Sequence, residues 1–144
     1  MHIYINPINP EAAKEVAFNL LPDDRREMEE GYGLNSQQIM INALKSSSTE
    51  FFLMPNRKIA AMGGIERGGK IWMLCTPNIY ESPILFVRAI KKYMQKSSEK
   101  ILWNFVDERN ENHLRLLKFL GFKFLNKVRF GPNNLTFIKF CLFN

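Results

Sequence analysis

The sequence predicts an α+β fold, in which helices flank a mixed and mostly antiparallel twisted sheet of about seven strands. Three observations predict this fold. Short apolar runs typical of strands alternate with stretches that have the spacing of amphipathic helices. Three strand-like runs follow one another directly in the middle of the chain. Residues 101–125 have the pattern of a strand, a polar turn, a helix, a glycine and a second strand.

The length of 144 residues indicates one domain, which spans residues 1–144. A hydrophobic content of 46% with 24% charged residues excludes a disordered chain. No apolar run approaches the roughly 20 residues that cross a bilayer, and the start of the chain lacks the features of a signal peptide. We therefore expect a cytoplasmic protein that has no membrane partner.

The net charge of +6 is concentrated in the second half of the chain. Residues 81–144 carry 12 Lys or Arg against 5 Asp or Glu, whereas residues 1–80 carry 8 against 9. A basic half can attract nucleic acid, a phosphorylated cofactor or an acidic protein, or it can be a solvated surface. No helix-turn-helix, zinc-finger or RNA-binding aromatic motif accompanies the charge, so specific nucleic-acid recognition is not expected.

The first third of the chain predicts one strand followed by helices. Residues 3–5 alternate as in a short strand, which a proline ends. Residues 11–21 are amphipathic, and Pro22 breaks the pattern. A second helix is predicted over residues 23–30 and a third over residues 36–45, separated by a glycine-containing loop.

The middle of the chain predicts an antiparallel meander of three strands, over residues 50–54, 58–65 and 70–75. Gly68 and Gly69 form the expected hairpin turn between the second and third of these strands.

A helix is predicted to begin at Ser82 and Pro83, a favourable N-cap and first-turn pair, and to continue through about Lys96. Residues 101–106 follow as a nearly continuous apolar run, which favours a strand buried on both faces.

The last part of the chain predicts a helix and two strands. Residues 111–120 have leucines on one face, Asn110 is placed to cap their N-terminus, and Gly121 is placed to end them. A strand resumes after the glycine, and residues 128–130 and 135–142 predict a terminal hairpin.

Short motifs occur in a fixed order over almost the whole chain. They are Asp24, Glu27 and Gly31 in DDRREMEEG, Ala60 to Gly64 in KIAAMGG, Trp72 to Thr76 in IWMLCT, Leu102 to Asn110 in LWNFVDERN, Leu117 to Phe122 in LKFLGF, and Phe137 to Phe140 in FIKF. With these motifs the chain resembles the GNAT acyltransferase superfamily. More narrowly, it resembles a phage-encoded GNAT-like group that includes a small internal virion or assembly protein of short-tailed phages.

The resemblance implies acetyl-CoA as a co-substrate, held in a gap where the fourth strand parts from the fifth, between Cys75 and Asn104. Backbone groups of the fourth strand would hold the pantetheine arm, and amides that open the next helix would hold the pyrophosphate. Asn110 either caps its helix or contacts the cofactor. The implied cofactor-binding residues are Met73, Leu74, Cys75, Thr76, Ser82 and Asn110.

Two features depart from the superfamily's pattern. The loop before the helix at Ser82 contains two prolines and Glu81 but no glycine, so it offers few amides to a phosphate. Leu117 stands where many members have a tyrosine that reprotonates the CoA thiolate. Tyr80 and Cys75 could replace that acid, although nothing in the sequence argues for either.

Glu27 is the candidate catalytic residue, as the general base that would deprotonate an amine acceptor. It shares a helix face with Asp24, and the resemblance places this helix near the acceptor site. The alternative is that both carboxylates only complement the positive end of a helix dipole. His113 is expected to be structural. Cys75 and Cys141 have no metal-ligand spacing, so reduced thiols and no metal site are expected.

Two functions therefore remain. One is an acetyl-CoA-dependent N-acetyltransferase that acts on an amine of a protein or small molecule. The other is a catalytically inactive GNAT-fold phage protein that acts in virion assembly or binds a host protein. In the second case the expected location is the host cytoplasm or the virion. The sequence leaves the acceptor and the oligomeric state open.

Overall fold

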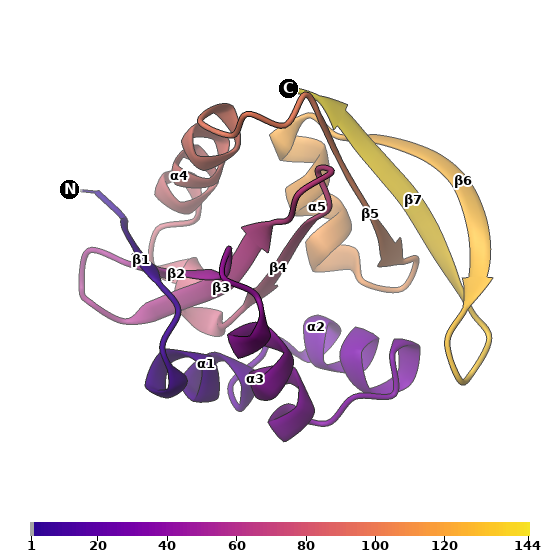
Figure 1. Cartoon of the computed structure of the whole chain (residues 1–144), viewed down its shortest axis with the longest axis horizontal. Coiled ribbons are helices and arrows are strands. Elements are labelled where there is room, and N and C mark those ends of the chain that lie inside the picture. The colour runs from indigo at the N-terminus through magenta and orange to yellow at the C-terminus, as the bar shows by residue number, and fades with distance from the viewer. Residues whose placement is uncertain (1) are drawn as a thin grey trace.

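A computed structural model describes residues 2–144, which form a two-part sheet flanked by helices (Figure 1). In chain order the elements are β1 Tyr4–Pro7, α1 Pro10–Ala17, α2 Pro22–Arg26, the π-helical turn η1 Glu27–Gly31, α3 Ser36–Lys45, β2 Glu50–Leu53, β3 Ile59–Ile65, β4 Ile71–Cys75, the 3₁₀ turn η2 Pro77–Glu81, α4 Pro83–Gln95, β5 Ile101–Asp107, α5 Glu111–Leu120, β6 Lys123–Phe130 and β7 Leu135–Phe143.

The strands form two antiparallel sheets that lie side by side. The first has the order β1-β2-β3-β4 and the second the order β5-β7-β6. The two sheets meet where β4 and β5 run parallel, and one isolated bridge joins Lys70 to Trp103. This arrangement confirms the predicted α+β fold with a mixed, mostly antiparallel set of seven strands.

Helices cover both faces of the four-stranded sheet, so the core has two parts. On one face α1 and α3 bury Val16 and Ile39 against Phe51 of β2 and Met62 of β3. On the other face α4 and α5 bury a larger cluster that continues onto the second sheet. That cluster includes Phe52, Phe86, Ile90, Leu102, Leu117, Leu120 and Phe140. Among residues 2–144, no helix has the length and apolar character needed to cross a membrane.

Helices with clear end signals have the predicted bounds. α3 spans Ser36–Lys45 as predicted, and a reciprocal capping box between Asn35 and Gln38 fixes its start. α5 spans Glu111–Leu120 as predicted, and Gly121 ends it with φ of 93°.

Two predicted helices in the first third are wrong in extent. α1 ends at Ala17 and not at residue 21, because the Asn19 side chain donates to the Glu15 carbonyl at 2.7 Å and closes the last turn. The helix predicted over residues 23–30 is divided into α2 and the π-helical turn η1. Wider turns of this kind are frequent at functional sites.

The prediction that β5 is buried on both faces is also wrong. Burial alternates along the strand, and Trp103 and Phe105 are half-buried. The Lys139 ammonium lies 5.6 Å from the Trp103 ring and 5.9 Å from the Phe105 ring, and partly covers them. A further correction concerns the end of the chain, where a single strand, β6, replaces the two segments predicted after the glycine.

Candidate functional site

β4 and β5 are joined at one end only. The Trp103 amide donates to the Gly69 carbonyl at 3.0 Å, beside the Lys70 bridge. Farther along, the Asn104 side chain replaces a backbone bond, since its Nδ2 donates to the Ile71 carbonyl at 2.8 Å. The strands then part toward their C-terminal ends (Figure 1). The fourth and fifth strands therefore part, as the resemblance implies; we call the space between their backbones the gap.

Gly69 holds the closed end of this gap, and we expect its replacement by alanine to destabilise the protein. Its φ is 89°, and an added Cβ would lie 1.8 Å from the Ile101 carbonyl oxygen. Gly68 has a similar φ of 96° but open space around it, so Gly68→Ala is the matched control. We expect Gly69→Ala to cost about 2 kcal/mol more than Gly68→Ala in urea unfolding. Equal costs would contradict the close approach of the two sheets.

Two carboxylates from the α2–η1 segment reach the open part of the gap. Asp24 Oδ2 accepts a hydrogen bond from the Cys75 amide of β4 at 2.9 Å. Glu27 Oε1 accepts one from the Asp107 amide of β5 at 2.9 Å. Both side chains are buried. The parting of the strands would leave the Cys75 and Asp107 amides without partners. The two carboxylates accept their hydrogen bonds instead.

Asn110 joins the two carboxylates from the far side of the gap. Its Nδ2 donates to Asp24 Oδ1 at 3.0 Å and to Glu27 Oε1 at 3.2 Å. Its Oδ1 accepts from the His113 amide at 3.1 Å, which confirms the predicted helix cap. The buried Asn110 side chain thus binds both carboxylates and caps α5, and these hydrogen bonds fix its position. We call Asp24, Glu27, Asn110 and His113 the polar cluster.

Protonation in the polar cluster is strongly perturbed. Burial raises the pKa of Glu27 to about 7, although His113 and the hydrogen bonds from Asp107 and Asn110 oppose the rise. Burial alone would lower the pKa of His113, but its Nδ1 lies 3.9 Å from Asp24 Oδ1, and this carboxylate raises the pKa above its ordinary value. Glu27 therefore exchanges a proton near neutral pH.

A second set of contacts clamps the same helical segment onto the loop after β5. Asp107 binds Arg109 through both carboxylate oxygens, with Nη2 to Oδ2 at 2.8 Å. These bonds hold the pKa of Asp107 below its usual value, although burial opposes the shift. Arg109 also binds Glu30 at 2.8 Å, and Arg26 donates to the Arg109 carbonyl at 2.8 Å.

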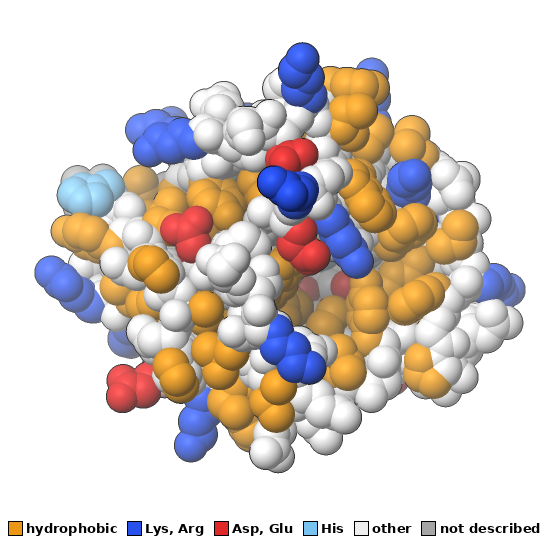
Figure 2. Space-filling model, in the orientation of Figure 1, with side chains coloured by type: hydrophobic (Ala, Val, Ile, Leu, Met, Phe, Trp, Pro, Cys, Tyr) orange, Lys and Arg blue, Asp and Glu red, His pale blue; other side chains and the backbone are white. Residues whose placement is uncertain are grey.

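A cavity of about 290 Å³ opens on one side of the polar cluster, where α3 faces the gap. Glu27 and His113 line it together with Tyr32, Trp72 and Phe105. Figure 2 shows this hollow between the two sheets, with acidic side chains visible at its bottom and hydrophobic side chains around it.

A smaller cavity of about 190 Å³ lies on the opposite side, between η2, the start of α4 and α5. Asp24 and Cys75 lie in its wall, and His113 lines both cavities. The polar cluster thus stands as a partition between the two. Burial, followed by the Asp24 charge, raises the pKa of the Cys75 thiol, so this cysteine stays neutral. Tyr80 lines the mouth and is exposed.

The structure brings together some of the residues that the sequence suggested, and separates others. Glu27, Cys75 and Asn110 meet at the gap. Met73 and Leu74 line the larger cavity. Thr76 is buried and donates to the Ile59 carbonyl at 2.7 Å, outside both cavities. Ser82 precedes α4 without a side-chain cap bond, also outside them. Thr76 and Ser82 therefore line neither cavity, and Leu117 is buried in the apolar core.

Sequence reasoning missed two members of the site. It gave Asp24 no role in the gap, and it gave His113 a structural role without a partner. The Asp24 and Glu27 spacing was the available signal, since it places both on one face of a helix. Within residues 2–144, no three His, Cys, Asp or Glu side chains are grouped to hold a metal ion.

Comparisons with solved structures show a GNAT fold. The chain is similar to an acetyltransferase of the GNAT family from Bacillus anthracis, with a TM-score of 0.74 and 9% identity over 99% of this chain and 95% of that one. It is also similar to Ard1 from Thermoplasma volcanium, with a TM-score of 0.69 and 8% identity over 99% and 98%. A GNAT-family acetyltransferase from Streptococcus pneumoniae is similar with a TM-score of 0.60 and 18% identity, over 99% of each chain. Identities this low establish the fold alone.

A comparison with family models identifies a narrower relationship. Residues 52–128, more than half of the chain, match the model described as bacteriophage T7, probable scaffold protein Gp13. A comparison with curated protein sequences returns no match. The matched segment runs from β2 to β6 and contains both strands that border the gap.

Proposed function

The chain belongs to the family of the bacteriophage T7 probable scaffold protein Gp13, and from this membership we propose that it acts in phage particle assembly. In this proposal it is a protein-binding component built on the GNAT fold and does not transfer acetyl groups. It works in the host cytoplasm and on assembling particles.

One observation carries the proposal, namely the hydrogen bond from the Cys75 amide to Asp24 at 2.9 Å. The GNAT resemblance implies that backbone groups of this strand hold the pantetheine arm of acetyl-CoA. Here the buried Asp24 carboxylate already accepts the hydrogen bond of the Cys75 amide. Asn110 and His113 hold that carboxylate in place. A pantetheine could accept from this amide only by leaving the buried Asp24 Oδ2 without its hydrogen-bond donor, which is costly.

Two further features support the absence of acetyl transfer. The cavity on the expected cofactor side measures about 190 Å³, below the roughly 300 Å³ at which ligand sites usually begin. α4 begins at Pro83, which has no amide hydrogen to donate to a phosphate. The residues present therefore do not fit acetyl-CoA.

The test of this part is a thermal unfolding experiment with acetyl-CoA. At an acetyl-CoA concentration roughly 100 times a typical micromolar Kd, we expect no rise in Tm. A ligand that bound at this concentration would raise the free energy of unfolding by about 2.7 kcal/mol and the Tm by several degrees. Isothermal titration calorimetry provides the independent check. A saturable shift with matching heat would overturn the proposal and establish a cofactor site.

The assembly role needs its own measurement. In infected cells, a tagged chain is expected to sediment with particle precursors in a sucrose gradient, because a scaffold protein contacts the proteins that it organises. A tagged, unrelated protein of similar size and charge is the control. A chain that stays at the top of the gradient with that control, while particles form normally, would contradict the assembly role.

Acetyl transfer is the second candidate function, and Glu27 favours it. A carboxylate with a pKa of about 7 beside a cavity of about 290 Å³ has the properties of a general base for an amine. If acetyl-CoA binds in the calorimetric test, Glu27→Gln should depress turnover and leave cofactor affinity unchanged. Unchanged turnover would remove Glu27 as the base.

A further inference from the structure

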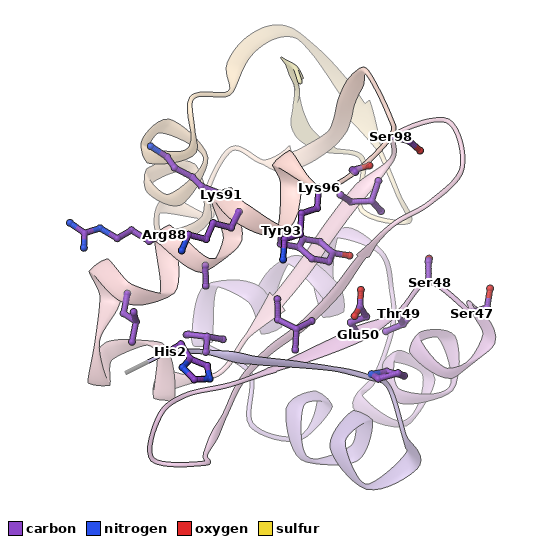
Figure 3. Close-up of a pocket in the computed structure, with 18 residues that line it drawn as sticks. His2, Ser47, Ser48, Thr49, Glu50, Arg88, Lys91, Tyr93, Lys96 and Ser98 are labelled. Atoms are coloured by element: carbon purple, nitrogen blue, oxygen red, sulfur yellow. The ribbon is translucent and has the colours of Figure 1, made fainter.

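A groove of about 1070 Å³ lies between β1 and α4, apart from the polar cluster (Figure 3). Its floor includes the apolar side chains of Ile3, Ile5 and Leu85. In Figure 3, Arg88 and Lys91 extend from the α4 side of this groove. The groove therefore combines an apolar floor with a basic wall.

The floor is apolar because β1 is the outermost strand and α4 packs over its neighbours. Ile5 lies opposite Phe52 in the β1–β2 register, so both side chains face the same side of the sheet. Phe52 is fully buried in the core beneath α4, whereas Ile5 is 36% exposed. Among residues 2–144, β1 pairs only with β2, and its other edge offers free backbone donors and acceptors.

The wall is basic because α4 places like charges on one helical face. Arg88 lies three and four residues before Lys91 and Lys92, and Lys92 lies four residues before the C-cap residue Lys96; all four are exposed. None forms an ion pair with any residue in the described part of the chain, and α4 itself contains no Asp or Glu. Like charges at this spacing repel, so an anionic partner would stabilise the helix as well as bind to it.

The floor and the edge strand favour an extended peptide over a nucleic acid as the anion. Tyr93 packs edge-on against Phe52, with ring centroids 5.3 Å apart, so its ring is not free to stack on a base. An edge strand beside an apolar floor is the geometry that accepts an added β-strand.

We propose that this groove binds an extended acidic segment of a partner protein. The segment adds to the free edge of β1 with its acidic side chains on the α4 side of the sheet and its apolar side chains on the opposite face. The methylene stems of the acidic side chains cover Ile3 and Ile5, and their carboxylates meet Arg88, Lys92 and the neighbouring basic residues. The inference rests on the proposed assembly function, since it identifies the surface and the chemistry through which a particle protein would be held.

Fluorescence anisotropy with a labelled peptide tests the binding. The probe is Leu-Asp-Val-Glu-Leu-Asp-Val-Glu, which alternates apolar and acidic side chains as a strand requires. We expect saturable binding to the full chain, reduced roughly tenfold or more by the double charge reversal Arg88→Glu with Lys92→Glu. The matched control is Lys118→Glu with Lys123→Glu, which makes the same charge change at exposed residues of α5 and β6 and should bind as the unmodified chain does.

Two further probes separate the alternatives. The same peptide with lysine at every acidic position should not bind. A labelled single-stranded oligothymidylate should bind more weakly than the acidic peptide, and tighter binding that the Arg88 and Lys92 reversal abolishes would replace the proposal with a nucleic-acid site. Absence of peptide binding, or equal loss in both double variants, would overturn the proposal.

The particle-precursor experiment keeps this inference separate from the assembly role. If the unmodified chain sediments with precursors and the Arg88 and Lys92 variant does so equally, the assembly role stands and the groove is not its route. If the peptide binds as expected but the unmodified chain does not sediment with precursors, the groove stands and the assembly role fails.

Discussion

Replacing Asp24 with alanine is expected to destabilise the protein by about 3 to 5 kcal/mol, because the change leaves several buried groups without their partner. The Cys75 amide and the Asn110 Nδ2 each lose their hydrogen bond to Asp24. His113, whose Nδ1 lies 3.9 Å from Asp24 Oδ1, loses its opposite charge in a largely buried position. The measurement is urea unfolding at neutral pH, followed by circular dichroism.

Two variants keep this prediction measurable even if the alanine variant does not fold. Asp24→Asn retains an acceptor for the Cys75 amide and should cost less than the alanine change, by about 1 to 2 kcal/mol. Asp23→Ala changes the neighbouring residue, whose ion pair with Arg26 at 3.5 Å is partly exposed, and should cost less than about 1 kcal/mol. Similar costs for Asp23→Ala and Asp24→Ala would show that the gap is not closed by Asp24.

The second large effect concerns pH. The pKa of Glu27 is raised from 4.5 to about 7 in the folded protein, so the folded state binds this proton more tightly than the unfolded state. Stability from this group is fully present below the unfolded pKa and is lost as the pH rises through 7. We expect the free energy of unfolding to fall by about 2 to 3 kcal/mol between about pH 5 and pH 8.

Glu27→Gln should flatten this dependence, because the amide is neutral throughout and its oxygen can still accept from Asp107. A smaller slope should remain, since the raised pKa of His113 acts in the same direction. Glu29→Gln, on the exposed side of the same helical turn, is the control and should leave the slope unchanged. Urea unfolding at four pH values gives the slopes, and an unchanged slope in Glu27→Gln would contradict the assignment.

Asp107 has the opposite effect on the pH dependence of stability. Its pKa is lowered, chiefly by the hydrogen bonds from Arg109 that outweigh burial, so its contribution is present above the unfolded pKa and is lost as the pH falls through the folded one. The two carboxylates therefore have opposite effects: the contribution of Glu27 is lost as the pH rises through neutrality, and that of Asp107 is lost in acid.

The sequence predicted the elements whose end signals are local. The helix before Gly121 and the helix after Asn35 have the predicted bounds because a positive-φ glycine and a capping side chain act within a few residues. The α+β order followed from the period of the apolar residues, which packing then confirmed. Asn110 was recognised as a cap for the same local reason.

The parts that could not be predicted depend on contacts between distant residues. Asp24 and the Cys75 amide are 51 positions apart, and Glu27 and the Asp107 amide are 80 apart. No local pattern indicates that these carboxylates satisfy strand amides across a gap. Apolar composition also led to a wrong prediction for β5, because Trp103 and Phe105 suit a strand buried on both faces but are partly covered by the Lys139 side chain.

The single bridge between the two sheets has a mechanical consequence. Tension applied between β1 and the C-terminal hairpin would cross the molecule at the junction of β4 and β5, which the Lys70 bridge, the Asn104 side chain and the apolar cluster shared by the two sheets hold together. The bonds through which Asp24 and Glu27 join β4 to β5 would share this load. Because one of these groups changes its charge near neutral pH, the force needed to separate the two sheets would depend on the acidity of the surroundings.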